Sequence, residues 1–124
     1  MNLPRPLVLA VDDDLDNLEL ISQVLALIKF SFITAANGHT AIVMAQTQQP
    51  DLILLDIMLP DLNGLEVISH LKQDDKTMAI PIIAVTAMAR EQDRNSFLMS
   101  GCIECVTKPY MLDELEMIIH RYLF

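Results

Sequence analysis

Acidic, hydroxyl and basic residues follow four short apolar runs of the sequence, each at the point where the run ends. Asp12 and Asp13 follow LVLAV, Asp56 follows LILL, Thr86 follows IIAV, and Lys108 follows IECVT. Carboxylates suit divalent cations, and an ammonium or a hydroxyl suits phosphate oxygens. If the runs are parallel strands, their carboxyl ends meet at one edge of a sheet, where α/β proteins bind ligands. The sequence therefore predicts a site for cation and phosphoryl chemistry at this edge.

Strand-like and helix-like segments alternate five times along the chain. The four apolar runs have the length and β-branched content of buried strands, and another strand is expected over 31–36. Apolar residues at helical spacing predict helices between and after the strands. Two of the five expected helices cover residues 39–48 and 90–100. The apolar stripes of the other three are, in chain order, Leu18, Ile21, Leu25 and Ile28; then Leu65, Ile68 and Leu71; and last Leu112, Leu115, Ile119 and Tyr122. This alternation predicts right-handed βαβ units, and so a parallel sheet with helices on both faces.

The length of 124 residues predicts one domain, covering residues 1–124, with a single hydrophobic core. The chain ends within the last expected helix, so we expect no attached output domain. Apolar runs are far shorter than a membrane span, and no contact with a membrane is expected. The apolar stretch near the start has only five residues and is followed by three aspartates, unlike a signal peptide, so a cytoplasmic location is expected.

The net charge of −9 makes direct binding to nucleic acid unexpected. Such binding depends mainly on a basic face that neutralises phosphates, and no basic cluster is present in the sequence. The same argument applies to anionic lipid surfaces.

Two cysteines, Cys102 and Cys105, form a C-x-x-C segment near the last strand. A zinc site needs two further ligands at suitable spacing, whereas His39, His70 and His120 are scattered along the chain. We therefore expect buried, reduced thiols, with redox or metal roles as the less favoured alternatives.

Four segments in order resemble the receiver domain of bacterial response regulators, over essentially the whole chain. They are LVLAVDDD, DLILLDIMLPDLNGLEV, AVTA and TKP. The second half, with GLEVISHLKQDD, IPIIAVTAMA and GCIECVTKPY, is also similar to stand-alone regulators that consist of a receiver alone. The resemblance implies a flavodoxin-like, doubly wound, five-stranded parallel sheet of order 2-1-3-4-5 with five helices.

The resemblance also implies a function in two-component signalling. Asp56 would accept a phosphoryl group from a histidine kinase or a His-phosphotransfer protein and form an acyl phosphate. The reaction would need Mg²⁺ or Mn²⁺, held by Asp13 directly, by Asp12 through water, by Asp56, and by the backbone carbonyl of Met58. Lys108 would contact the phosphoryl group and Asp56. The chain would catalyse only its own phosphorylation and dephosphorylation, and so would be a signalling phosphoacceptor and no enzyme in the usual sense.

The output would come from a conformational change. In the family, the hydroxyl of Thr86 moves to the phosphoryl oxygens, and the face formed by the fourth helix, fifth strand and fifth helix presents the result to a protein target. The bond between Lys108 and Pro109 is expected to be cis by resemblance. Receivers commonly have Tyr or Phe three residues before the lysine, where this chain has Cys105. An aromatic rotamer switch at that position is therefore excluded.

Three methionines, Met88, Met99 and Met111, belong to the same region of the sequence. Methionine suits adaptable binding surfaces, so these residues could serve recognition of a target. Packing in the core is the simpler interpretation, and we expect it.

Two other functions agree with part of the pattern. A small phosphatase of the haloacid dehalogenase type would use Asp12 as nucleophile and Asp14 as its partner, but Asp16 stands where that family has Thr or Val. A receiver used only as a non-phosphorylated interaction module would not need the complete set of site residues. Asp14 has no ligand role in the receiver family, and either a solvated loop or a helix N-terminus is expected for it.

Overall fold

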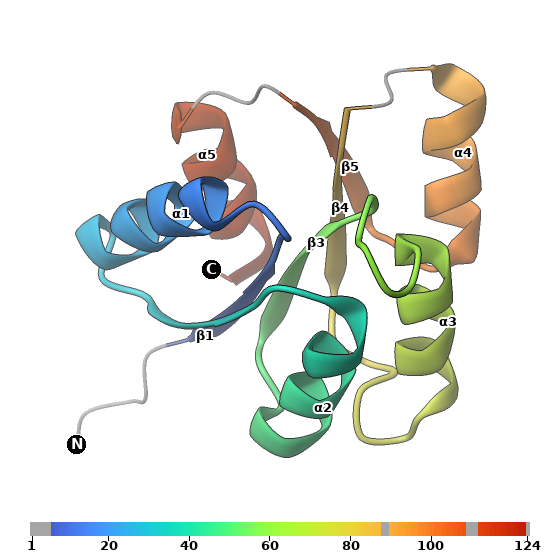
Figure 1. Ribbon diagram of the computed structural model, residues 1–124. Helices are drawn as coiled ribbons and strands as arrows, with labels where there is room; N and C mark the ends of the chain where they lie inside the picture. Colours follow the sequence, from blue (N-terminus) through green and yellow to red (C-terminus); the bar gives the residue numbers. More distant parts are fainter. Residues whose placement is uncertain (1–5, 88–89, 109–111, 124) are drawn as a thin grey trace.

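The computed structural model describes residues 6–87, 90–108 and 112–123, and its centre is a five-stranded parallel sheet (Figure 1). The strand order is β2-β1-β3-β4-β5, which confirms the predicted flavodoxin-like topology. The strands are β1 (Leu7–Val11), β2 (Ser31–Ala35), β3 (Leu52–Asp56), β4 (Ile82–Thr86) and β5 (Glu104–Thr107).

Five helices cover the two faces of the sheet (Figure 1). They are α1 (Leu15–Leu27), α2 (Gly38–Gln48), α3 (Gly64–Gln73), α4 (Glu91–Ser100) and α5 (Leu112–Leu123). Helices α1 and α5 cover one face, and α2, α3 and α4 cover the other. Each face has its own apolar cluster, one including Leu25 and Ile119 and the other including Ile68 and Phe97. Within the described residues, no helix has the length and apolar character needed to cross a membrane.

The central strands β3 and β4 are buried along their whole length. Because helices cover both faces, these strands are continuous apolar runs without the alternation of a half-exposed strand. Each run ends in a polar residue at the carboxyl-terminal edge of the sheet. Asp56 pairs in register with Val85, and Thr86 pairs with Thr107, so the carboxyl ends of β3, β4 and β5 lie at the same level.

Three helices begin at side chains that accept hydrogen bonds from their first turn, as helix N-termini require. Asp14 accepts from the backbone N–H groups of Asp16 and Asn17, Asn37 caps α2, and Asn63 caps α3. Of the two places expected for Asp14, a solvated loop or a helix N-terminus, the structure shows the helix N-terminus.

Some predicted details were wrong. Strand β2 ends one residue early, at Ala35, and α2 starts at Gly38 because Asn37 is its cap. Leu65 and Leu112 have helical apolar spacing but are exposed, since each lies in the first turn of its helix, beyond the edge of the core.

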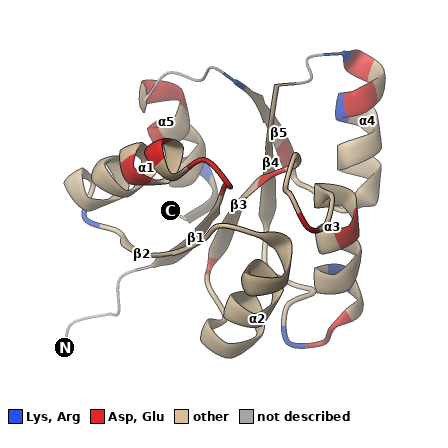
Figure 2. Ribbon diagram, viewed as in Figure 1, with Lys and Arg blue, Asp and Glu red and all other residues tan. Residues whose placement is uncertain are grey.

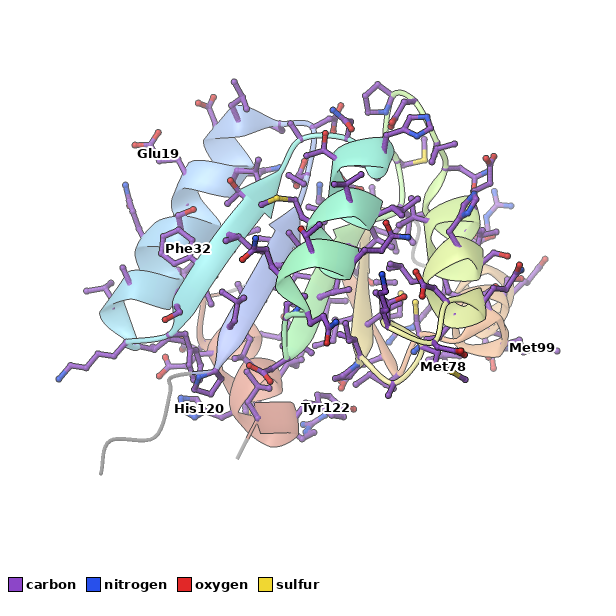
Figure 3. The ribbon with its side chains drawn as sticks, turned by 90° about the horizontal axis from the view of Figure 1, so that it is seen from below. Glu19, Phe32, Met78, Met99, His120 and Tyr122 are labelled. Carbon is purple, nitrogen blue, oxygen red and sulfur yellow. The ribbon has the colours of Figure 1, made fainter. Side chains whose placement is uncertain are left out.

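Met99 contradicts the expected core packing of the three methionines. Its side chain is 89% exposed and lies at the outer edge of the molecule on α4 (Figure 3). Helix α4 buries only Phe97 among its ten residues, because its sequence has few apolar positions. Met88, Met111 and the Lys108-Pro109 bond fall outside the described residues.

Candidate functional site

Three carboxylates meet at the edge of the sheet where β1 and β3 end. Oxygen atoms of Asp12, Asp13 and Asp56 all lie within 4.8 Å of one another. Figure 2 shows acidic segments at the ends of β1 and β3 and a basic segment where β5 ends. Asp12 and Asp56 are buried, with 2% and 4% exposure, whereas Asp13 is exposed. The site therefore opens to solvent on the Asp13 side.

Lys108 reaches this cluster from the end of β5. Its Nζ lies 3.0 Å from Oδ2 of Asp56 and 3.1 Å from Oδ2 of Asp12, so one ammonium joins the two buried carboxylates. The backbone N–H of Lys108 donates to the carbonyl of Thr86 at 2.7 Å. Because this bond continues the pairing of β4 with β5, the sheet itself fixes where the lysine side chain starts.

Backbone groups hold both buried carboxylates in place. The N–H of Met58 donates to Oδ1 of Asp56 at 3.0 Å, and the N–H of Asp14 donates to Oδ1 of Asp12 at 2.9 Å. The amide of Asn17 also donates to Oδ2 of Asp12, at 3.4 Å. Each carboxylate therefore has one oxygen bound by backbone and the other facing Lys108.

Three carboxylates at this spacing repel one another when they are ionised. Burial raises the pKa of Asp56 above its ordinary value, and the nearby charge of Asp12 raises it further, although the hydrogen bonds from Met58 and Lys108 oppose this. Burial alone would lower the pKa of Lys108, but hydrogen bonds to Asp56 and Asp12 outweigh it and raise that pKa. Lys108 stays protonated, and it compensates one of three negative charges.

A hard divalent cation fits the charge that remains. Two carboxylate charges stay uncompensated, and the donor atoms are oxygens, which Mg²⁺ and Mn²⁺ prefer. The open side at Asp13 leaves room for water ligands, which Mg²⁺ retains. The acidic cluster thus has the composition, spacing and charge of a magnesium site.

The remaining predicted site residues lie at the same edge. Thr86 is fully buried as the last residue of β4. Met58 is two residues beyond Asp56, and its side chain is 59% exposed. The sheet therefore brings together all the residues that the sequence singled out for cation and phosphoryl chemistry.

Comparison with known proteins decides the family. The family model of the response regulator receiver domain matches residues 8–120. The chain belongs to this family. It is 36% identical over 121 residues to the polar-differentiation response regulator DivK of Brucella anthropi, covering 98% of each protein. As a receiver domain, it is a signalling module of two-component systems, and this confirms the resemblance seen in the sequence.

Solved structures agree with this receiver assignment. The receiver domain of sensor histidine kinase PA1611 from Pseudomonas aeruginosa, with magnesium coordinated in its active site cleft, superposes with a TM-score of 0.88. The identity is 30%, and the match covers 98% of both chains. Chemotaxis response regulator CheY4 of Vibrio cholerae gives a TM-score of 0.91 at 25% identity, covering 96% of this chain and 99% of CheY4. These matches support the receiver prediction and give no support to the dehalogenase-type phosphatase.

The two cysteines of this receiver are free and buried, as expected. Burial raises the pKa of Cys102 to about 12, and burial also raises that of Cys105. Both thiols remain protonated at neutral pH, which makes them poor nucleophiles and poor metal ligands.

Sequence reasoning missed two residues that make contacts at the site or in the loop beside it. Asn17 contacts Asp12, and helical spacing from Asp14 was a signal that could have shown it. Asp61 binds the start of α2 from the loop after β3. No local signal indicates this second contact, because its partners are 22 and 23 residues away.

Replacing Asp56 by Asn is predicted to stabilise this receiver in metal-free buffer at neutral pH. Because the pKa of Asp56 is raised in the folded state, its ionised carboxylate lowers the free energy of unfolding when the pH is above that pKa. Asn carries no charge and removes this cost, and Lys108 keeps its ion pair with Asp12. We expect a gain on the order of 1 kcal/mol, or a rise in Tm of about 4 °C. The gain should shrink as the pH falls through the raised pKa of Asp56, and it should vanish well below the ordinary value of 3.8, where the carboxyl is protonated in both states. Thermal melts at pH 7 and about pH 2.5 measure this, and an unchanged or lower Tm at pH 7 would contradict it.

Proposed function

We propose that this chain accepts a phosphoryl group on Asp56 in a magnesium-dependent reaction. A carboxylate oxygen of Asp56 attacks the phosphorus, and a P–O bond forms as the P–N bond to the donor histidine breaks; the imidazole, protonated on its other ring nitrogen, leaves as a neutral base. The observation that carries this proposal is the convergence of Lys108 on two buried carboxylates beside an exposed third. Enzymatic turnover of another substrate forms no part of it.

Asp12, Asp13, Asp56 and the backbone carbonyl of Met58 would hold the cation. When bound, Mg²⁺ supplies positive charge that allows an anionic phosphoryl group to approach the acidic cluster. Two unit charges 4 Å apart near a protein surface interact by about 4 kcal/mol, so the uncompensated carboxylates would otherwise repel that group. Asp12 accepts three hydrogen bonds, from the N–H of Asp14, the amide of Asn17 and Lys108, whereas Asp56 accepts two; this favours a water-mediated role for Asp12 and direct ligation by Asp13.

Lys108 and Thr86 would act on the phosphoryl group from the ends of β5 and β4. The ammonium of Lys108 neutralises charge at Asp56, and the hydroxyl of Thr86 would bind the phosphoryl oxygens after transfer. Because these residues end β5 and β4, their movement would be transmitted to the adjoining face of α4, β5 and α5.

Receiver domains interact with histidine kinases or phosphotransfer proteins, and we propose such a protein as the phosphodonor here. A downstream protein target would bind the face of α4, β5 and α5. Weak anchoring of α4, whose Arg94 donates to the carbonyl of Cys105 at 3.3 Å, supports this choice of face. The acidic net charge supports protein partners over nucleic acid, and a cytoplasmic location remains the prediction of the sequence.

Mapping the acyl phosphate tests the proposal. The protein is treated with acetyl phosphate and Mg²⁺, the acyl phosphate is trapped by borohydride reduction, and the modified residue is found by mass spectrometry. We expect the label on Asp56 and its loss when EDTA replaces Mg²⁺. A label on Asp12 would instead support phosphatase-like chemistry, and a protein without label would be a non-phosphorylated module.

A further inference from the structure

The loop between β3 and α3, residues 57–63, is closed at its base. The N–H of Gly64 donates to the carbonyl of Ile57 at 2.8 Å, and the N–H of Ile57 donates to Val85 of β4. A Cβ at Gly64 would lie 2.6 Å from the Cα of Ile57, so only glycine permits this approach. The loop therefore leaves the sheet edge and returns to it, and Met58 lies on its outgoing side.

The far part of this loop is attached to a different helix. Oδ1 of Asp61 accepts from the N–H of Gly38 at 2.7 Å, and Oδ2 accepts from the N–H of His39 at 2.9 Å. Both carboxylate oxygens thus bind the first turn of α2, toward which the loop bends in Figure 1. Free N–H groups and the helix dipole make this turn a favourable place for an anion.

Gly38 makes the attachment close. A Cβ at this position would lie 2.9 Å from Cβ of Leu62 and 3.0 Å from Cγ2 of Val67. The side chains of Leu62, in the loop, and of Val67, in α3, therefore pack directly on the first turn of α2. The hydrogen bonds to His39 and Gly38 hold the pKa of Asp61 at about 2, so its carboxylate stays ionised at neutral pH.

We propose that Asp61 is a positioning residue, which holds the loop so that the carbonyl of Met58 faces the metal site. This inference rests on the proposed function, because it takes the carbonyl of Met58 as a ligand. Asp61 touches neither the cation nor the phosphoryl group. It acts by fixing one end of a short segment whose other end is fixed by the N–H of Met58 on Asp56.

Positioning of this kind has a specific kinetic signature. When Asp61 is replaced, the backbone carbonyl of Met58 samples more orientations, so the cation site is less preorganised. Asp56, Lys108 and Thr86 stay on their strands, because the sheet holds them. The variant should therefore need more Mg²⁺ but reach a nearly normal maximal rate once Mg²⁺ is saturating.

The experiment compares Asp61→Ala with Asp74→Ala as matched control. Asp74 also binds α2 through its side chain, accepting from Nε2 of Gln46 at 2.9 Å. It lies in the turn after α3, at the opposite end of the sheet (Figure 1). Mg²⁺ dissociation constants come from titration calorimetry, and rates of phosphorylation by acetyl phosphate are measured over a series of Mg²⁺ concentrations.

For Asp61→Ala, we expect Mg²⁺ affinity to fall on the order of tenfold, with a maximal rate within about twofold of wild type. Asp61→Asn, which keeps one acceptor oxygen, should recover part of the affinity, and Asp74→Ala should leave it unchanged. Unchanged Mg²⁺ affinity in Asp61→Ala, or an equal loss in Asp74→Ala, would overturn the positioning role while the proposed function stands. A wild-type protein that binds no Mg²⁺ would overturn both.

Discussion

Replacing Asp56 by Asn is expected to abolish phosphorylation by acetyl phosphate while the domain stays folded. An amide has no nucleophilic carboxylate oxygen, so no acyl phosphate can form at this position. We expect no substitution by the neighbouring carboxylates, because Asp12 accepts three hydrogen bonds where Asp56 accepts two, and Asp13 lies on the solvent side. Incorporation of the phosphoryl group, measured by intact-protein mass spectrometry, should fall below the detection limit, at least about a thousandfold below wild type.

The stability of the same variant makes this result interpretable. Because burial raises the pKa of Asp56, its replacement by Asn should raise Tm, so lost phosphorylation cannot be attributed to unfolding. Asp51→Asn is a matched control, since Asp51 precedes β3 at the opposite end of the strand and accepts from the N–H of Leu7 at 2.8 Å. It should be phosphorylated normally. Residual label in Asp56→Asn would mean that another carboxylate is the acceptor.

The candidate site could be predicted from the sequence because its signal is local. Each of Asp56, Thr86 and Lys108 ends an apolar run, and a parallel sheet must bring such strand ends to one edge. Burial on both faces made β3 and β4 continuous apolar runs, which are the clearest strand signals. The arrangement of the three carboxylates needed the structure, because only packing shows that Asp12 is buried and Asp13 exposed.

Contacts between distant segments could not be predicted from the sequence. Asp61 looks like an ordinary turn residue between Pro60 and Asn63, and its partners belong to a helix that ends before β3 begins. Met99 was assigned to the core because methionine is apolar, yet Phe97 is the only residue that α4 buries. The number of apolar positions in a helix therefore predicts exposure better than residue type.

The same contrast separates input from output in this receiver. Input residues are attached to the sheet, where backbone pairing fixes them. Under the proposed function, output would depend on α4, whose Arg94 donates to the carbonyl of Cys105 and whose Phe97 is buried. Since Cys105 is buried and too small to rotate as an aromatic would, we expect any change in α4 to come from backbone movement at the end of β4 or β5.

Replacing Lys108 by Ala is expected to slow phosphorylation about a hundredfold or more at saturating Mg²⁺. The ammonium lies 3.0 Å from Asp56 and is placed to stabilise charge that develops on the phosphoryl group. Loss of one such preorganised donor typically costs about 3–4 kcal/mol of transition-state stabilisation.

The Lys108→Ala variant should also unfold more easily in metal-free buffer, by about 2 kcal/mol, because Asp12 and Asp56 lose the ammonium that they share. Rates from acetyl phosphate and melts with and without Mg²⁺ measure both effects.

The Mg²⁺ dependence separates this role from that of Asp61. Removing a positive charge from the cluster should tighten Mg²⁺ binding, so Lys108→Ala should have a higher affinity and a low maximal rate, the reverse of Asp61→Ala. Lys76→Ala removes an exposed lysine from the turn after α3 and should change neither quantity. If Lys108→Ala is phosphorylated within threefold of the wild-type rate, the ion pairs of Lys108 serve folding alone. The charge that stabilises transfer would then have to come from the cation.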